Sequence, residues 1–336
     1  MVERPAHVVK ELVENALDAG ATTVSVSLKD AGKSLIRIVD NGCGMAPDDA
    51  ELCFQAHATS KISSIDDLAS VATFGFRGEA LASVAAISKV TLRTKEAGLA
   101  DDALGVMLVC SYNVIQTRAS VACTAGTDIA VEDLFFNTPV RKKFLKQDQT
   151  EWNAVATVIN AFVLSHTGVH FKLYHNDMLM LNAPPVVSAK DRAAQIWEQD
   201  VAQSMVPVAT DADVREGRLR MHGFISQPTV WRYGRTHLYF FVNNRWVKNA
   251  EISKGLLKGY SDMLPPGRFP AGLIFVDIDT QQIDVNIHPK KEEIKFTQPG
   301  VVQTTLAALV KKTLEQQVSE KISWQRKSDR IDSSFF

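Results

Sequence analysis

The sequence predicts an α+β fold in two domains. Its 336 residues are 46% hydrophobic, which is enough for a substantial core and longer than one typical domain. Alternating apolar and polar residues predict strands, and separate stretches with helical spacing predict helices. These elements do not follow a regular β-α-β alternation, which favours an α+β fold over a parallel α/β fold.

The first predicted helix begins near Pro5, because proline is well tolerated in a first helical turn. Apolar residues then recur at helical spacing as far as Leu17, and Gly20 provides a left-handed stop. Glu11 and Asn15, four residues apart, lie on one side of this helix and can face one ligand. The alternative interpretation is a solvated helix edge beside the apolar stripe.

The rest of the chain contains further elements of both kinds. We expect strands at residues 23–28, 35–39, 90–94, 105–110, 127–131, 171–174, 217–225, 237–242 and 272–277. We expect further helices at residues 47–54, 65–71, 79–87, 150–165, 191–197, 250–260 and 301–318. The predicted domains are residues 1–195 and 196–320, and residues 321–336 begin a linker or tail.

The two halves of the chain differ in charge although the net charge is −1. Residues 201–336 carry 19 Lys/Arg and 14 Asp/Glu, a balance of +5, which leaves 18 and 24, or −6, for residues 1–200. A mildly basic second half fits nucleic-acid contact and fits a solvated surface equally well. No apolar run reaches membrane-spanning length, and the cysteines have neither zinc-ligand nor disulfide-framework spacing. The composition predicts a cytoplasmic protein with reduced thiols.

Two glycine-containing loops outline a pocket. Asp40 ends the second strand, and Gly42 and Gly44 after it allow the backbone to approach a ligand closely. Gly75 and Gly78 precede a helix whose first amides, with the helix dipole, form an anion site. An ordinary helix cap is the alternative there.

The chemistry of a nucleotide site is present in these groups. Glu11 can deprotonate a water, and the Asn15 amide oxygen is a hard ligand of the kind that Mg²⁺ prefers. Asp40 can accept a hydrogen bond from the amino group of adenine. The amides of residues 75–78, with the hydroxyl and ammonium groups of residues 59–61, can contact phosphates.

Several segments resemble the motifs of one ATPase family, at residues 11–20, 40–45, 57–61, 75–81, 126–127, 133–144, 242–245 and 284–291. The sequence is identified as a member of the MutL family of DNA mismatch repair proteins, within the gyrase, Hsp90, histidine-kinase and MutL superfamily. This resemblance implies a Bergerat-type ATPase α/β sandwich followed by a ribosomal-protein-S5-like transducer domain.

The resemblance also implies roles for individual residues. Glu11 is the expected general base, Asn15 is an expected magnesium ligand, and Asp40 is expected to form a hydrogen bond with adenine. Lys291 is expected to reach the γ-phosphate of ATP from the second domain, and a surface lysine beside Lys290 is the alternative. The other expected ATP contacts are Gly42, Gly44, Thr59, Ser60, Lys61, Gly75, Phe76, Arg77, Gly78, Glu79, Ala80, Leu81 and Thr127.

The mechanism implied by the resemblance is a slow ATP-driven clamp. ATP and Mg²⁺ order a lid at residues 57–78, and two N-terminal halves associate as a homodimer. The closed state engages DNA, a MutS-like mismatch-recognition protein and downstream nuclease or helicase factors, and hydrolysis resets it. The candidate DNA contacts in the second half are Arg232, Arg235, Arg245, Arg268, Lys311 and Lys312.

Two departures from the family lead to an alternative function. The sequence shows no counterpart of the arm that precedes Glu3 in the family, and none of the C-terminal dimerisation domain that carries an endonuclease in many members. Because the arm helps to close the lid and pair the protomers, the alternative is a non-catalytic scaffold for DNA and repair proteins with weak or no turnover. A type II topoisomerase ATPase subunit is a second alternative, which the runs at residues 137–139 and 288–289 argue against.

Overall fold

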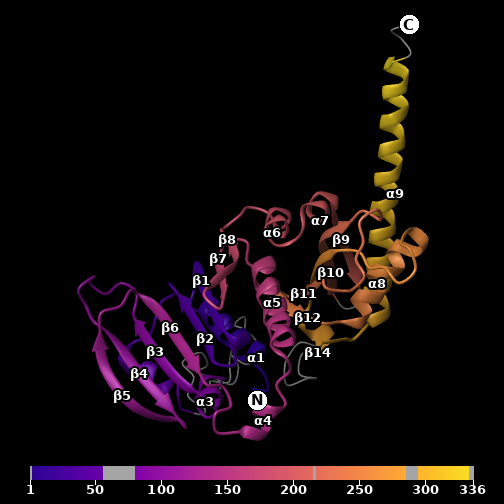
Figure 1. Cartoon of the computed structure of the whole chain (residues 1–336). Coiled ribbons are helices and arrows are strands. Elements are labelled where there is room, and N and C mark those ends of the chain that lie inside the picture. Colours follow the sequence, from indigo (N-terminus) through magenta and orange to yellow (C-terminus); the bar gives the residue numbers. More distant parts are fainter. Residues whose placement is uncertain (1, 56–79, 215–216, 285–293, 333–336) are drawn as a thin grey trace. The chain divides into compact units, whose positions relative to one another are not determined.

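The computed structural model describes residues 2–55, 80–214, 217–284 and 294–332. The chain forms two compact units, Met1–Val187 and Ser188–Phe336, and each unit combines helices with a β-sheet (Figure 1). The predicted α+β class is confirmed. The predicted domain limits at 195 and 320 stay a prediction.

The first unit is built on an eight-stranded sheet with the order β5-β4-β3-β6-β2-β1-β7-β8. Strands β1 and β7 pair in parallel, and all other neighbours in this sheet are antiparallel. The strands are β1 (Thr23–Lys29), β2 (Leu35–Asp40), β3 (Lys89–Lys95), β4 (Gly105–Ser111), β5 (Val114–Val121), β6 (Gly126–Glu132), β7 (His170–His175) and β8 (Met178–Ala183).

The first unit also contains helices. They are α1 (Pro5–Asp18), the short 3₁₀ helix η1 (Asp30–Gly32), α2 (Pro47–Leu52), α3 (Ala80–Ala85), α4 (Pro139–Lys143) and α5 (Asp148–Ser165). Of these, α1, α2 and α3 contact strands of the sheet. Helix α1 lies beside α5 and contacts β2 (Figure 1). Its apolar stripe is buried, as the helical spacing of valine and leucine requires, and Val8, Val9 and Val13 have no exposed surface.

The second unit has a five-stranded sheet with the order β12-β11-β13-β10-β9, in which only β11 and β13 pair in parallel. Its strands are β9 (Met205–Val214), β10 (Gly217–Ser226), β11 (Leu238–Val242), β12 (Arg245–Val247) and β13 (Gly272–Ile278), with a separate pair, β14 (Ile283–Asp284) and β15 (Lys295–Phe296). Its helices are α6 (Ala189–Ile196), α7 (Gln199–Ser204), α8 (Ala250–Tyr260), η3 (Ser261–Met263), η4 (Thr280–Gln282) and α9 (Pro299–Asp332).

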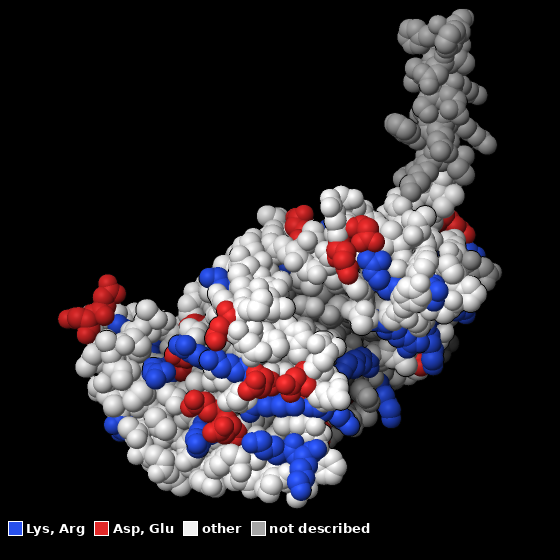
Figure 2. Space-filling model, in the orientation of Figure 1, with Lys and Arg blue, Asp and Glu red and all other residues white. Residues whose placement is uncertain are grey.

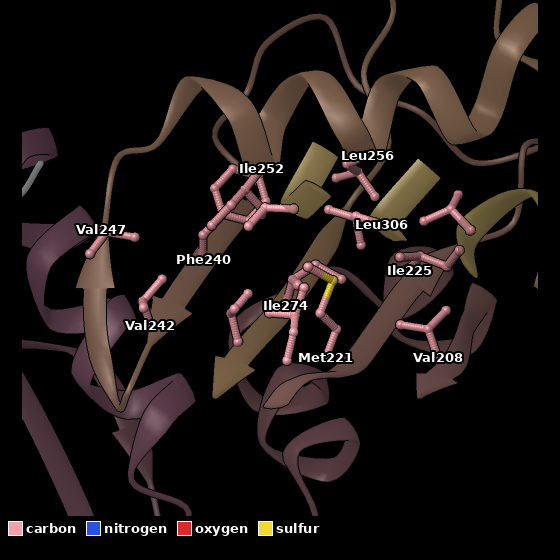
Figure 3. Packing of buried hydrophobic residues seen from close by; sticks show 14 of the residues in the cluster. Val208, Met221, Ile225, Phe240, Val242, Val247, Ile252, Leu256, Ile274 and Leu306 are labelled. Carbon is pink, nitrogen blue, oxygen red and sulfur yellow. The ribbon is translucent and has the colours of Figure 1, made fainter. Parts of the chain in front are cut away.

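The core of the second unit lies between one face of this sheet and helices α8 and α9 (Figure 3). Met221 and Ile274 from the sheet pack against Ile252 and Leu256 of α8 and against Leu306 of α9. All five side chains are fully buried. Burial of each such side chain contributes about 1.5–3 kcal/mol to folding.

The structure differs from the sequence prediction at several elements. Strands β5, β8, β9, β12 and β15 and helices α4 and α7 were not predicted. The closing helix, predicted at residues 301–318, runs from Pro299 to Asp332, because no glycine or proline follows Gly300 to end it. Residues 321–332, which were expected to begin a linker or tail, continue this helix. The predicted helix at residues 65–71 lies outside the described residues.

The described surface shows no strong charge bias on the face in Figure 2, where acidic and basic side chains are interspersed over the first unit. A search of the described residues found no helix that combines the length and the apolar character needed to cross a membrane.

Candidate nucleotide-binding site

Helix α1 carries the two side chains that the sequence singles out first. Glu11 and Asn15 lie on this helix and are half-buried, so each combines a fixed backbone with a side chain that a ligand can reach. Pro5 stands at the start of the helix, and the chain leaves it at Gly20 with a φ of 73°. Both predicted helix ends are confirmed.

Asp40 lies at the end of β2, where a loop begins that we call the strap (residues 41–45). The strap contacts the end of α1, because the Cys43 amide donates to the Ala19 carbonyl at 2.9 Å. Its other side contacts the segment after β3, where the Ala97 amide donates to the Cys43 carbonyl at 2.8 Å. The strap is therefore fixed from both sides, next to the helix that carries Glu11.

Two glycines allow the strap to lie this close to its neighbours. A Cβ atom on Gly44, whose φ is 66°, would stand 2.0 Å from the Lys95 carbonyl oxygen. A Cβ atom on Gly126, whose φ is 112°, would stand 2.2 Å from the Asp40 carbonyl oxygen. Each position requires glycine for its positive φ and for lack of space.

Asn41 holds the beginning of the strap against β1. Its Oδ1 accepts hydrogen bonds from the amides of Thr22 at 2.9 Å and Thr23 at 2.7 Å, and its Nδ2 donates to the Thr22 hydroxyl at 2.8 Å. No role for Asn41 was predicted from the sequence. Its place between an acid and a glycine was a signal of a turn residue that bonds to nearby backbone.

The carboxyl group of Asp40 is desolvated and accepts backbone hydrogen bonds. Its Oδ1 accepts from the Gly42 amide at 2.8 Å, and the Thr127 amide of the paired strand β6 also donates to it. Burial raises the pKa of this carboxyl from 3.8 to about 6, and the two amides limit the rise. Asp40 and Thr127 are register partners, so the structure brings together the expected adenine contact and a residue that the family resemblance expects to act on adenine through a water.

Few side chains among the described residues are placed to coordinate a magnesium ion. No group of three His, Cys, Asp or Glu side chains there could hold a metal ion. Mg²⁺ fits this finding, because it commonly keeps several waters and takes one or two protein oxygens together with phosphate oxygens. The half-buried amide of Asn15 can supply such an oxygen.

Most of the expected phosphate contacts lie outside the described residues. These are Thr59, Ser60, Lys61, Gly75, Phe76, Arg77, Gly78, Glu79 and Lys291. Helix α3 begins at Ala80, and the Leu81 side chain is buried in it, so Leu81 can meet a ligand only through its backbone.

One buried hydroxyl at this site has no counterpart in the sequence prediction. Thr94, on β3, accepts a hydrogen bond from the Met45 amide at 3.0 Å and donates one to the Gly126 carbonyl at 2.9 Å. Only the pairing of β3 with β6 shows that it lies beside Thr127, because the two threonines are 33 residues apart.

Two family models match the sequence. Residues 3–135 match the histidine kinase-, DNA gyrase B- and HSP90-like ATPase, and residues 193–315 match the DNA mismatch repair protein, C-terminal domain. The DNA mismatch repair protein MutL of Syntrophotalea carbinolica is 41% identical over 316 residues, which are 94% of this chain and 49% of that protein. MutL of Desulforamulus reducens is also 41% identical, over 94% of this chain and 48% of that protein. The chain spans about half the length of the curated relatives it matches.

Solved structures resemble the fold as well. The Aquifex aeolicus MutL ATPase domain complexed with ADP is 27% identical, with a TM-score of 0.61, and the match covers 83% of this chain and 93% of that one. The N-terminal domain of a DNA repair protein, at 24% identity, shares the fold with a TM-score of 0.81 over 94% of this chain and 96% of that one. An ATPase domain followed by a transducer domain is thus confirmed. The chain belongs to the MutL family of DNA mismatch repair proteins.

Proposed function

We propose that the pocket formed by α1 and the strap binds ATP and that the chain hydrolyses it slowly with magnesium. The observation that carries this proposal is Asp40, a desolvated carboxyl at a strand end whose two amide partners are already in place. A desolvated carboxylate is costly, and it gains a partner when the exocyclic amino group of adenine donates to it. The relative solved with ADP supports the choice of nucleotide.

The residue roles follow from the positions on α1. Glu11 accepts a proton from the attacking water, and the Asn15 amide oxygen binds magnesium one turn away. Bound magnesium would neutralise phosphate charge and orient the phosphates. We assign phosphate contacts to residues 59–61, to residues 75–81 and to Lys291 on the family resemblance alone.

Binding of ATP would act as a switch. Two protomers associate in the ATP-bound state, engage DNA and contact a MutS-like protein and downstream nuclease or helicase factors, and hydrolysis separates them. The match to MutL relatives over 94% of the chain supports these partners. We propose that the protein acts in the bacterial cytoplasm, on the nucleoid when DNA is bound.

The decisive experiment measures ATP binding and hydrolysis for the parent, Asp40→Asn and Glu11→Ala proteins. We expect Asp40→Asn to bind ATP at least about tenfold more weakly, because one acceptor in the base pocket becomes a donor. We expect Glu11→Ala to bind ATP normally and to lose about 10²-fold or more in hydrolysis rate. Parent-like binding by Asp40→Asn would show that the base pocket is elsewhere.

A non-catalytic scaffold remains the competing function. Turnover per protomer distinguishes the two, because hydrolysis that depends on association must rise with protein concentration. A rate per protomer that is constant and close to background over a hundredfold concentration range would favour the scaffold.

A further inference from the structure

Thr94 is a buried hydroxyl in the nucleotide pocket that no role described so far uses. Its side chain is 1% exposed, so its hydroxyl must find its partners within the protein. Those partners are the last residue of the strap, Met45, and the first residue of β6, Gly126.

The strand order explains why this hydroxyl matters. Strand β6 lies between β2 and β3, and Thr127 is the register partner of Asp40 on one side and of Thr94 on the other. The strap leaves β2 at Asp40, and its last amide, that of Met45, is held by Thr94 on β3. The strap thus crosses the end of β6, and its two ends are fixed on opposite sides of Thr127.

The hydrogen bonds also set the direction of the Thr127 hydroxyl. Thr94 has one hydroxyl hydrogen, and the Gly126 carbonyl at 2.9 Å is a closer acceptor than the Thr127 hydroxyl at 3.4 Å. With that hydrogen used, a hydrogen bond across the 3.4 Å between the two hydroxyls is one in which Thr127 donates to Thr94. The Thr127 oxygen then offers only lone pairs to a ligand.

We infer that Thr94 is a positioning residue that makes the base pocket select an amino group over a carbonyl group on the purine. Asp40 and Thr127 together present acceptors only, which suits the 6-amino group of adenine and repels the 6-oxo group of hypoxanthine or guanine. Thr94 acts through Met45 and Thr127 and does not itself touch the base. The inference rests on the proposed ATP function.

The test compares ATP with inosine triphosphate, which replaces the 6-amino group by an oxygen. Calorimetric titration with each nucleotide in the presence of Mg²⁺ would be done on the full chain as parent, Thr94→Val, Thr94→Ser and Thr91→Val. Valine has the shape of threonine without its hydroxyl, and serine keeps the hydroxyl. Thr91→Val is the matched control, because Thr91 lies on the same strand outside these contacts.

We expect Thr94→Val to lose about tenfold in affinity for ATP while its affinity for inosine triphosphate stays equal or rises, because the freed Thr127 hydroxyl can then donate. Thr94→Ser and Thr91→Val should keep the parent preference. If Thr94→Val lost the same factor in affinity for both nucleotides, or if Thr94→Ser lost the preference for ATP, Thr94 would have only a structural role and the inference would be overturned.

The same titrations separate this inference from the proposed function. If Asp40→Asn loses ATP binding while Thr94→Val keeps the parent preference for ATP, the inference fails and the ATP pocket stands. If the parent binds neither nucleotide, both fail. If Thr94→Val unfolds, the serine variant decides, since it must retain the preference for ATP for the inference to hold.

Discussion

The Asp40 carboxyl, just before the strap, lowers the stability of the folded protein and is proposed to bind the nucleotide. Burial raises the pKa of the Asp40 carboxyl to about 6, so near neutral pH the folded protein holds a carboxylate where water solvates it poorly. Groups kept in this state are frequent at functional sites, because a ligand that completes their contacts recovers the cost.

The pH dependence of stability follows from that shift. The folded state binds the Asp40 proton more tightly than the unfolded state does, so the stability contributed by this group is present below about pH 4 and lost as pH rises through about 6. Asp40→Asn removes the titration. We expect the nucleotide-free variant to be more stable than the parent by about 1–2 kcal/mol at pH 8 and no more stable at pH 4.

Urea unfolding of both proteins at pH 4, 6 and 8 measures this difference. A gap between the two proteins that does not change with pH would contradict the pKa shift. If the stability advantage of Asp40→Asn became smaller as pH rises, the pKa of Asp40 would be lowered by folding and not raised.

A second residue-scale prediction concerns Gly44. Gly44→Ala places a Cβ atom 2.0 Å from the Lys95 carbonyl and keeps a strained φ of 66°. Gly98→Ala is a matched control with a φ of 87° and open space around the new Cβ atom. We expect a loss of about 2–4 kcal/mol for Gly44→Ala and about 1 kcal/mol for Gly98→Ala in urea unfolding.

ATP binding should also separate these two variants. We expect Gly44→Ala to bind ATP more weakly, because the strap must move away from β3, and Gly98→Ala to bind like the parent. Equal unfolding losses would mean that backbone strain alone, without the close contact, fixes glycine at position 44.

At the scale of elements, four of the missed strands share one property. Strands β5 and β8 are the two edges of the eight-stranded sheet, and β9 and β12 are the two edges of the five-stranded sheet. The edge strands β5 and β8 carry mostly exposed or half-buried side chains, so their sequences need not alternate in hydropathy, whereas β9 contributes Val206 and Val208 to the core. Strand β9 even contains Pro207, a residue that an edge tolerates. The central strands, buried on at least one face, were predicted from their pattern.

One ion pair links the start of α1 to α5, and its acidic partner is buried while its basic partner is half-buried. Arg4, just before the helix, donates through its Nε to Glu151 Oε2 of α5 at 3.0 Å, and Glu151 Oε1 accepts from the Lys146 amide at 2.9 Å. Glu151 is 1% exposed. Without it, the half-buried Arg4 guanidinium and the Lys146 amide would both lose this carboxylate as their acceptor.

We expect Glu151→Ala to lower the free energy of unfolding by about 1–3 kcal/mol, because the half-buried Arg4 and the Lys146 amide both lose their acceptor. Asp177→Ala, which removes a pair with Lys29 between largely exposed side chains, should cost at most about 1 kcal/mol. Thermal or urea unfolding of the two variants measures both. Similar losses would show that Arg4 finds water when Glu151 is removed.

At the scale of the whole molecule, the candidate DNA-contacting arginines of the second unit differ in the partners that they already have. Arg232 is held by Asp200 at 3.0 Å and by Glu198 at 3.3 Å. The Arg268 guanidinium instead lies 4.0 Å from the ring centre of Tyr233, a side chain that is 75% exposed. An arginine on an exposed aromatic ring can contact phosphate while the ring stacks on an unpaired base.

We expect Arg268→Ala to weaken DNA binding and to lower the slope of log affinity against log salt by about one, as the loss of one phosphate contact requires. Arg37→Ala is the control, because Arg37 is paired through both its Nε and its Nη2 with Asp128. Fluorescence anisotropy with single-stranded DNA at several salt concentrations gives both slopes. Identical slopes for the two variants would remove Arg268 from the DNA contacts.

The sequence by itself determined the α+β class, the central strands and the family, because these depend on local patterns of apolar residues and on motifs that are continuous in the chain. It also selected Glu11, Asn15 and Asp40 as candidates. It could not find Thr94 or the role of Gly126, because those follow from strand pairing. Only the tertiary structure placed β6 between β2 and β3 and brought Thr94 and Thr127 within 3.4 Å. Non-local pairing of this kind leaves no periodic trace in the sequence, since each strand repeats the same two-residue pattern whichever neighbour it has.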